Sequence, residues 1–183
     1  MKKTVWTFGL ISGGIVSLLM IVATAFQDAI GFDKGEIIGY TTMVLSFLLI
    51  FFGVRSYRDN AVGGRLSFGR AFVVGSLIAL ISSVCYVATW EVIYFKMSPD
   101  FSAKYAAHMV EKARASGASQ AAIDTKIAEM QKFQAMYSNP LMNAAITFME
   151  PLPVGLVIAL VSAGILRRKG DRDPTTGLAR ATD

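Results

Sequence analysis

Residues 53–75 read GVRSYRDNAVGGRLSFGRAFVVG and join two apolar runs that contain no charged residue. One acid, Asp59, lies among the basic residues of this stretch. The basic residues are Arg55, Arg58, Arg65 and Arg70. Membrane proteins keep short segments rich in arginine on the cytoplasmic side. We therefore interpret the stretch as a cytoplasmic loop, with a turn at Gly63-Gly64 and a helix that starts at Ser67.

The composition supports a membrane protein and excludes several other classes. Of the 183 residues, 54% are hydrophobic, and the mean hydropathy is +0.49. The pI of about 9.4 could indicate a nucleic-acid partner. We exclude nucleic acid because the basic residues lie at the ends of apolar runs, as they do in membrane proteins. The single cysteine, Cys85, lies inside an apolar run and offers neither a disulfide nor a metal pattern.

The chain is predicted to be all-α, with four transmembrane helices at about 4–27, 36–55, 69–96 and 141–167. The first apolar run, 5–26, has 22 residues, which span roughly 33 Å as a helix. The alternative for this run is a cleaved signal peptide, although the run is longer than the usual core of such peptides. Pro151 and Pro153 interrupt the fourth run and predict a bend or a helix restart.

Residues 98–138 are too polar to span a membrane and predict an amphipathic helical hairpin outside the cytoplasm. Ser98-Pro99 marks the start of its first helix, and Ser119 can cap the second. The apolar face must be buried against the bundle, the membrane surface or a partner, and we expect it to dock over the mouth of the bundle. Residues 1–169 then form one domain, and 170–183 form a disordered cytoplasmic tail.

Charge counting gives the orientation of the helices. The N-terminus, the arginine stretch and the C-terminus together hold 11 Lys or Arg and 4 Asp or Glu, whereas the opposite side holds 7 and 9. The positive-inside bias therefore places both termini in the cytoplasm. The expected location is a bacterial inner membrane, crossed several times.

Four segments carry a family resemblance over roughly residues 3–169. They are GVRSYRD (53–59), GGRLSFGRAF (63–72), PDF (99–101) and PVGLVIALVSAGILRRK (153–169). These segments resemble the uncharacterised bacterial membrane family catalogued as domain of unknown function 4199. The resemblance implies a small inner-membrane protein of four helices. It implies no assigned reaction and no catalytic residues.

Four acids are expected at one depth, near the outer ends of the four helices. They are Asp28, Glu36, Glu91 and Glu150. Carboxylates at the membrane interface cost far less than carboxylates at its centre, so simple solvation of these side chains explains them. The alternative is a cluster that binds a cation, a proton or a basic ligand, with Glu91 and Glu150 as its main members.

Other features also have two interpretations. The four arginines fix the orientation, and they can in addition bind anionic lipid headgroups. Small residues at four-residue spacing pack helices within one bundle, or they form a face for a homodimer or another membrane protein. These residues are Gly9 and Gly13 in the first helix, Ala71, Gly75, Ala79 and Ser83 in the third, and Gly155, Ala159 and Ala163 in the fourth.

No motif indicates catalysis, a cofactor or a metal site. His108 is the single histidine and is interpreted as an ordinary surface or interface residue. The chain shows no phosphate-binding loop, dinucleotide fingerprint or zinc-protease motif. We therefore expect a non-enzymatic structural, accessory or partner- or lipid-binding protein. The alternative is a small transporter or channel-like protein that uses the outer acids.

Overall fold

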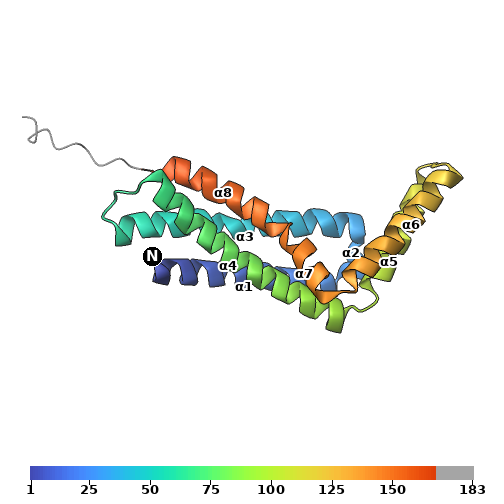
Figure 1. Cartoon of the computed structure of the whole chain (residues 1–183). Coiled ribbons are helices and arrows are strands. Elements are labelled where there is room, and N and C mark those ends of the chain that lie inside the picture. Colours follow the sequence, from blue (N-terminus) through green and yellow to red (C-terminus); the bar gives the residue numbers. More distant parts are fainter. Residues whose placement is uncertain (168–183) are drawn as a thin grey trace, which may run out of the picture.

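The computed structural model describes residues 1–167, so the predicted tail at 170–183 lies outside the described residues. The described part is helical without a strand, as the sequence predicts. The elements, in chain order, are α1 (Lys2–Ala25), α2 (Gln27–Ile30), α3 (Phe32–Ala61), α4 (Phe68–Val92), a π-helix η1 (Ile93–Met97), α5 (Phe101–Ala115), α6 (Gln120–Tyr137), α7 (Pro140–Phe148) and α8 (Pro151–Leu166). Figure 1 shows an elongated bundle with a helical hairpin leaving one end.

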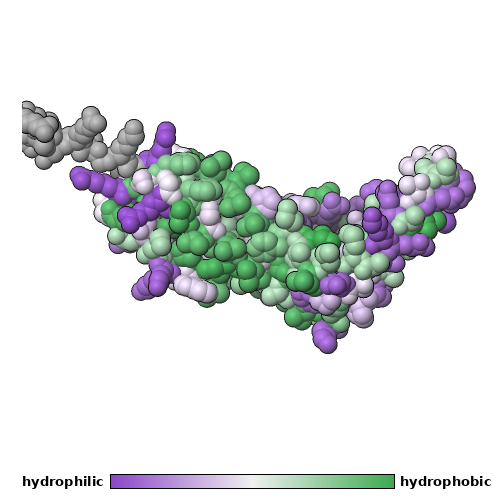
Figure 2. Space-filling model, in the orientation of Figure 1, coloured by the Kyte–Doolittle hydropathy of each residue, from purple (hydrophilic) through white to green (hydrophobic). Residues whose placement is uncertain are grey.

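Four segments of the described chain are long and apolar enough to cross a membrane. They are Lys2–Ala25, Phe32–Ala61, Phe68–Met97 and Pro140–Leu166. Large apolar side chains such as Leu18, Leu45 and Ile165 remain 59–65% exposed on the outside of the bundle. Figure 2 shows a hydrophobic band between hydrophilic ends on one face of the molecule. Such a large apolar surface on a monomer is typical of contact with lipid.

We name the two ends of the bundle by their residues. The arginine end contains the start of α1, the connection 62–67 and the end of α8; the hairpin end contains α2, η1 and the bases of α5 and α6 (Figure 1). At the arginine end, α3 continues to Ala61 and carries Arg55 and Arg58 on its last turns. The predicted arginine loop is therefore shorter than expected, because a helix extends beyond the apolar run that marks its membrane part.

The short connection 62–67 confirms the predicted turn and cap. Gly63 and Gly64 have φ values of 60° and 82°, which glycine adopts without the steric penalty of a side chain. The Ser67 hydroxyl oxygen then accepts a hydrogen bond from the Arg70 backbone N–H at 3.4 Å and caps α4.

The core of the bundle forms where α4 packs against α1, α3 and α8 through small residues. A Cβ atom at Gly75 would lie 2.8 Å from the Ala159 Cβ, and one at Gly155 would lie 2.7 Å from the Ala79 Cβ. On the other side of α4, a Cβ at Gly13 would lie 2.7 Å from the Cys85 Cβ. The small-residue stripes are thus occupied by packing within the chain, which is the first of the two interpretations given above.

Serine hydroxyls join the same helices by hydrogen bonds. Ser12 of α1 donates to the Ser46 carbonyl of α3 at 2.9 Å, and Ser82 of α4 donates to the Gly9 carbonyl of α1 at 3.2 Å. Both donors are fully buried. In an apolar environment such hydrogen bonds add to the packing that holds helices together.

The fourth membrane segment is broken where the prolines predict a restart. Helix α7 ends at Phe148 and α8 begins at Pro151, so Glu150 lies in the break. Asn139 accepts a hydrogen bond from the Leu141 backbone N–H at 3.0 Å, and Pro140 occupies the first turn of α7. The break brings a carboxylate between two short helices instead of along one long helix.

Helices α5 and α6 form a hairpin. Its base, which is the start of α5 and the end of α6, joins the bundle. Helix α5 starts at Phe101, two residues after the predicted Ser98-Pro99 signal, and Ser119 caps α6 by accepting from the Ala122 N–H at 3.3 Å. The Gln134 amide donates to the Ser102 carbonyl at 3.1 Å between the two helices. Only the base lies over the bundle; the turn near Gly117 stands clear of it (Figure 1). The expected docking over the mouth therefore applies to the base alone.

Candidate functional site

A pocket of about 350 Å³ lies at the hairpin end, between the bundle and the base of the hairpin. Helices α1 and α3 contribute Val16, Met20 and Gly39 to its wall. Further wall residues come from α4 and from the base of α5 and α6. A volume of this size is at the lower end of the range for small-molecule sites, roughly 300–1,000 Å³.

Two carboxylates line this pocket, one from α3 and one from the break between α7 and α8. Glu150 accepts a hydrogen bond from the Tyr86 hydroxyl at 3.1 Å, and that bond fixes the direction of its carboxylate. Glu36 lines the same pocket, one helical turn before Tyr40. These are the charged residues among the described residues that form the wall.

Aromatic rings make up much of the remaining wall. Trp90 contacts Phe101 with 5.0 Å between ring centroids, and Phe101 stacks on Tyr105 at 6.3 Å. The ring contacts continue to Phe133 and Tyr137, whose centroids are 4.1 Å apart. Because edge-to-face contacts orient such rings, the cluster gives the pocket a defined wall.

Asn143 of α7 supports this wall from behind. Its side-chain oxygen accepts from the Trp90 indole N–H and from the Thr147 hydroxyl, each at 3.1 Å. Its amide donates to the Tyr137 carbonyl at 3.2 Å. Asn143 is fully buried, and it connects α4, α6 and α7 at one point.

The four acids predicted from the sequence do not all meet. Glu36 and Glu150 line the pocket. Asp28 lies outside it, 3.6 Å from the Lys104 ammonium. Glu91 does not line the pocket, and its Oε1 atom is buried without a hydrogen-bond partner among the described residues. The structure therefore brings Glu36 and Glu150 together in one pocket. It separates Glu150 from Glu91, the two residues that were expected to be the main members of a cluster.

Ion pairs join α5 to the start of α3 beside the pocket. The Lys112 ammonium donates to the Asp33 carboxylate at 2.6 Å, and this hydrogen bond raises the pKa of Lys112. His108 also contacts Asp33 at 3.3 Å, so the histidine lies at the interface between α5 and α3. At the start of α5, the hydrogen bond from Lys104 lowers the pKa of Asp100, the residue that precedes the helix.

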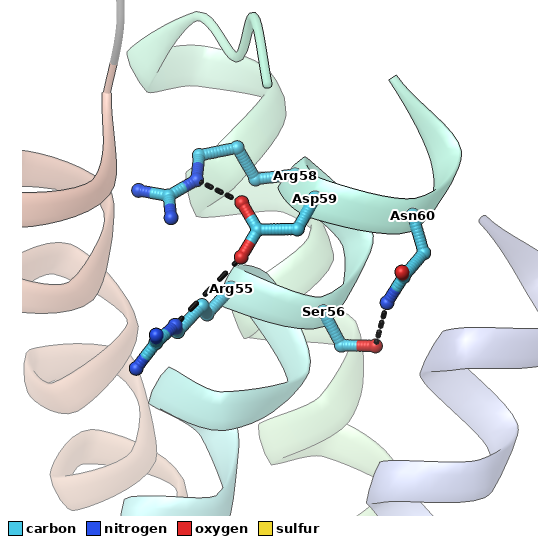
Figure 3. A network of polar contacts seen from close by, with 5 residues as sticks. All are labelled: Arg55, Ser56, Arg58, Asp59 and Asn60. Carbon is cyan, nitrogen blue, oxygen red and sulfur yellow. Dashed lines mark hydrogen bonds and ion pairs between the residues drawn. The ribbon is translucent and has the colours of Figure 1, made fainter. Parts of the chain in front are cut away.

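The four arginines lie at the opposite end of the bundle. Figure 3 shows the Asp59 carboxylate between Arg55 and Arg58. Its oxygens lie 3.7 Å from the Arg55 Nε and 2.7 Å from the Arg58 Nε. Arg65 and Arg70 are exposed and form no ion pair within residues 1–167. The same described range contains no group of three or more His, Cys, Asp or Glu that could hold a metal ion.

Sequence reasoning did not identify the aromatic part of the pocket. Phe101 was noted only within the PDF segment of the family resemblance, and Tyr86 lies inside an uncharged run without any distinguishing pattern. Their shared pocket depends on how α4 meets the hairpin base, which periodicity within one helix does not reveal.

The sequence of the chain matches the model of a known protein family. No curated protein and no solved structure matches the chain. The family model described as "Protein of unknown function (DUF4199)" matches residues 7–168, which is most of the chain. The chain therefore belongs to the DUF4199 family, as the resemblance in its arginine stretch and last helix predicted.

Proposed function

We propose that this protein is a non-enzymatic, multi-pass protein of a bacterial inner membrane that binds a small ligand or a lipid headgroup in the pocket at its hairpin end. One observation carries the proposal: the pocket is lined by two carboxylates and a cluster of aromatic rings, and it lies at one end of an otherwise closely packed bundle. The charge bias supports an orientation with the arginine end in the cytoplasm. The pocket then faces the outside.

Packing toward the arginine end favours binding over conduction. Phe47, Ile50 and Ile78 are fully buried between the pocket and that end. A Cβ atom at Gly53 would lie 2.5 Å from the Ile78 Cδ1 and 3.0 Å from the Phe8 Cγ, so side chains fill the space between the helices at this level. The described residues thus form a pocket closed on the arginine side.

The arginine end supports a second contact, with lipid. Arg65 and Arg70 are exposed there, and each basic side chain near an anionic membrane surface contributes about 1 kcal/mol. We propose that they bind anionic headgroups while they fix the orientation. This contact is separate from the pocket, whose lining residues lie toward the hairpin end of the bundle.

A small transporter is the second candidate. It is favoured by the presence of Glu36 and Glu150 in one pocket between membrane helices. Transport requires the packing around Phe47 and Ile78 to open, or further chains to complete a path. Uptake into vesicles that contain the purified protein distinguishes this candidate from binding alone.

Native mass spectrometry of the protein released from its own membranes tests the proposal. Gly39 lines the pocket and a Cβ atom there would meet nothing within 4 Å, so Gly39→Trp fills the space without a clash in the core. Gly14→Trp is the control, because Gly14 is equally open but lies outside the pocket. We expect a bound small molecule or lipid on the native chain and on Gly14→Trp, reduced at least about tenfold on Gly39→Trp.

Equal ligand occupancy in Gly39→Trp and Gly14→Trp would show that the ligand binds outside the pocket. The same spectra give the number of chains per complex, and therefore show whether a second copy or another membrane protein is bound. Both variants are compared by thermal unfolding in detergent, so that a folding defect is recognised.

A further inference from the structure

We propose that the ligand of this pocket is an organic ammonium cation, held by the Glu150 carboxylate and by the aromatic wall. The inference rests on the proposed function, because it names the chemical class of the ligand at that same site. It excludes anionic ligands and bare metal ions as the natural occupants. The argument has three steps, from charge, from ring chemistry and from the shape of the site.

The charge of the pocket wall is negative. Glu36 and Glu150 are its charged residues within the described chain, and no lysine or arginine is among the residues that line it. The nearest basic side chains of the hairpin already form ion pairs: Lys104 with Asp100 at 3.0 Å, and Lys112 with Asp33 at 2.6 Å. Since those bases are engaged by other acids, a cation from outside is the partner that would balance the two carboxylates.

The aromatic rings supply the second part of the site. Trp90, Phe101, Tyr105 and Tyr137 all line the pocket that holds Glu150. The faces of such rings attract ammonium groups, and sites for quaternary ammonium ions are built from several rings around the charge. A cluster of rings would add nothing specific for an anion, because its faces are negative.

The site suits an organic cation better than a metal ion. The Glu150 carboxylate accepts a hydrogen bond from the Tyr86 hydroxyl at 3.1 Å, which leaves acceptor capacity for an N–H donor, and its charge attracts a quaternary ammonium that has no N–H. Calcium and magnesium need six or more oxygen ligands around a small centre. Two carboxylates in a space of about 350 Å³ with aromatic walls do not provide that shell.

Two sources can present this chemistry. One is the headgroup of an aminophospholipid such as phosphatidylethanolamine, because Val16 and Met20 of α1 extend the pocket wall along a membrane helix. The other is a free amine in the external solution. Both present an ammonium group to Glu150, so the experiment has one arm for each source.

The test uses the full chain in nanodiscs of phosphatidylglycerol, with Trp6→Phe so that Trp90 is the sole tryptophan. Choline is titrated against 3,3-dimethylbutan-1-ol, an uncharged molecule of the same shape, by Trp90 fluorescence and calorimetry. A parallel arm measures by native mass spectrometry how much phosphatidylethanolamine the protein retains from mixed nanodiscs. Glu150→Gln removes the charge but keeps the shape, and Glu91→Gln is the control acid outside the pocket.

We expect choline to bind at least about tenfold more tightly than the uncharged isostere, or phosphatidylethanolamine to be enriched to the same degree over phosphatidylglycerol. Either preference should fall about tenfold in Glu150→Gln and stay within about twofold in Glu91→Gln. The first result identifies a free amine and the second a lipid headgroup.

Two results would overturn the inference. If the isostere binds as tightly as choline, or if Glu150→Gln keeps the preference for the cation, the pocket binds ligands but does not select ammonium groups, and the proposed function stands alone. If neither probe binds and no phosphatidylethanolamine is retained, the inference fails, and the proposed function is decided separately by the native mass spectrometry of Gly39→Trp and Gly14→Trp. Thermal unfolding of each variant separates loss of binding from loss of folding.

Discussion

Single glycines decide how closely the helices of this bundle approach one another. In Gly155→Ala the new methyl group would lie 2.7 Å from the Ala79 Cβ, so α4 and α8 must separate. We expect a loss of about 1–3 kcal/mol in the free energy of unfolding, because both positions are on the buried contact line. Thermal unfolding of the purified protein in detergent measures this as a lower Tm.

Gly164→Ala is the matched control for that substitution. It lies on the same helix, and an added Cβ atom meets nothing within 4 Å. Alanine favours a helix by about 1 kcal/mol over glycine, so the control should be neutral or slightly stabilising. Equal Tm values for Gly155→Ala and Gly164→Ala would contradict the packing described between α4 and α8.

Residue depth could be derived from the sequence, but residue direction could not. Counting residues from the arginines placed Glu91 and Glu150 near the same end of their helices. A single residue turns a helix face by about 100°, so the direction of each carboxylate depends on which neighbour its helix packs against. Glu150 enters the pocket because the proline break reorients its segment, whereas Glu91 lies outside the pocket wall.

At the scale of elements, Asn143 connects three segments around the pocket. In Asn143→Ala the Trp90 indole N–H, the Thr147 hydroxyl and the Tyr137 carbonyl each lose a partner. Buried polar groups without partners cost about 1–3 kcal/mol each. We expect looser attachment of the hairpin base, seen as a red shift of Trp90 fluorescence in the Trp6→Phe chain and as faster amide exchange at the end of α6.

Asn60→Ala provides the comparison for that variant. Asn60 is exposed at the arginine end, where it donates to Ser56 at 3.3 Å, and Figure 3 shows this pair. Its replacement should leave both the fluorescence and the exchange unchanged. If Asn143→Ala behaves like Asn60→Ala, Asn143 does not connect the hairpin base to the bundle.

The existence of the helices was predictable, and their ends were less so. Hydropathy identifies the apolar part of each helix. It therefore predicted that the second helix ends near Arg55, although α3 continues to Ala61. Helix starts were predicted correctly where the side chain of the capping residue accepts a hydrogen bond from a backbone N–H, as at Ser67 and Ser119. At Ser98 no such bond forms, and the helix starts later, after Asp100.

At the scale of the whole molecule, the two ends of the hairpin differ. Its base forms part of the pocket wall, and its tip projects away from the bundle. The sequence showed that residues 98–138 are amphipathic, but amphipathicity alone does not say where an apolar face is buried. The base buries its rings against α4 and the pocket, and the turn stands clear of the bundle (Figure 1). The contact between distant segments that creates the pocket was therefore beyond prediction from helical periodicity.

The central claim is that a membrane-spanning bundle carries this pocket on its outer side, and cysteine labelling tests it most directly. In a Cys85→Ala chain, which has no other cysteine, Ser116→Cys marks the hairpin turn and Asn60→Cys marks the arginine end. Both positions are exposed. In intact spheroplasts treated with a membrane-impermeant maleimide, the account predicts labelling at position 116 and none at position 60 until the membrane is permeabilised. Labelling at position 60 but not at 116, or at both before permeabilisation, would contradict it.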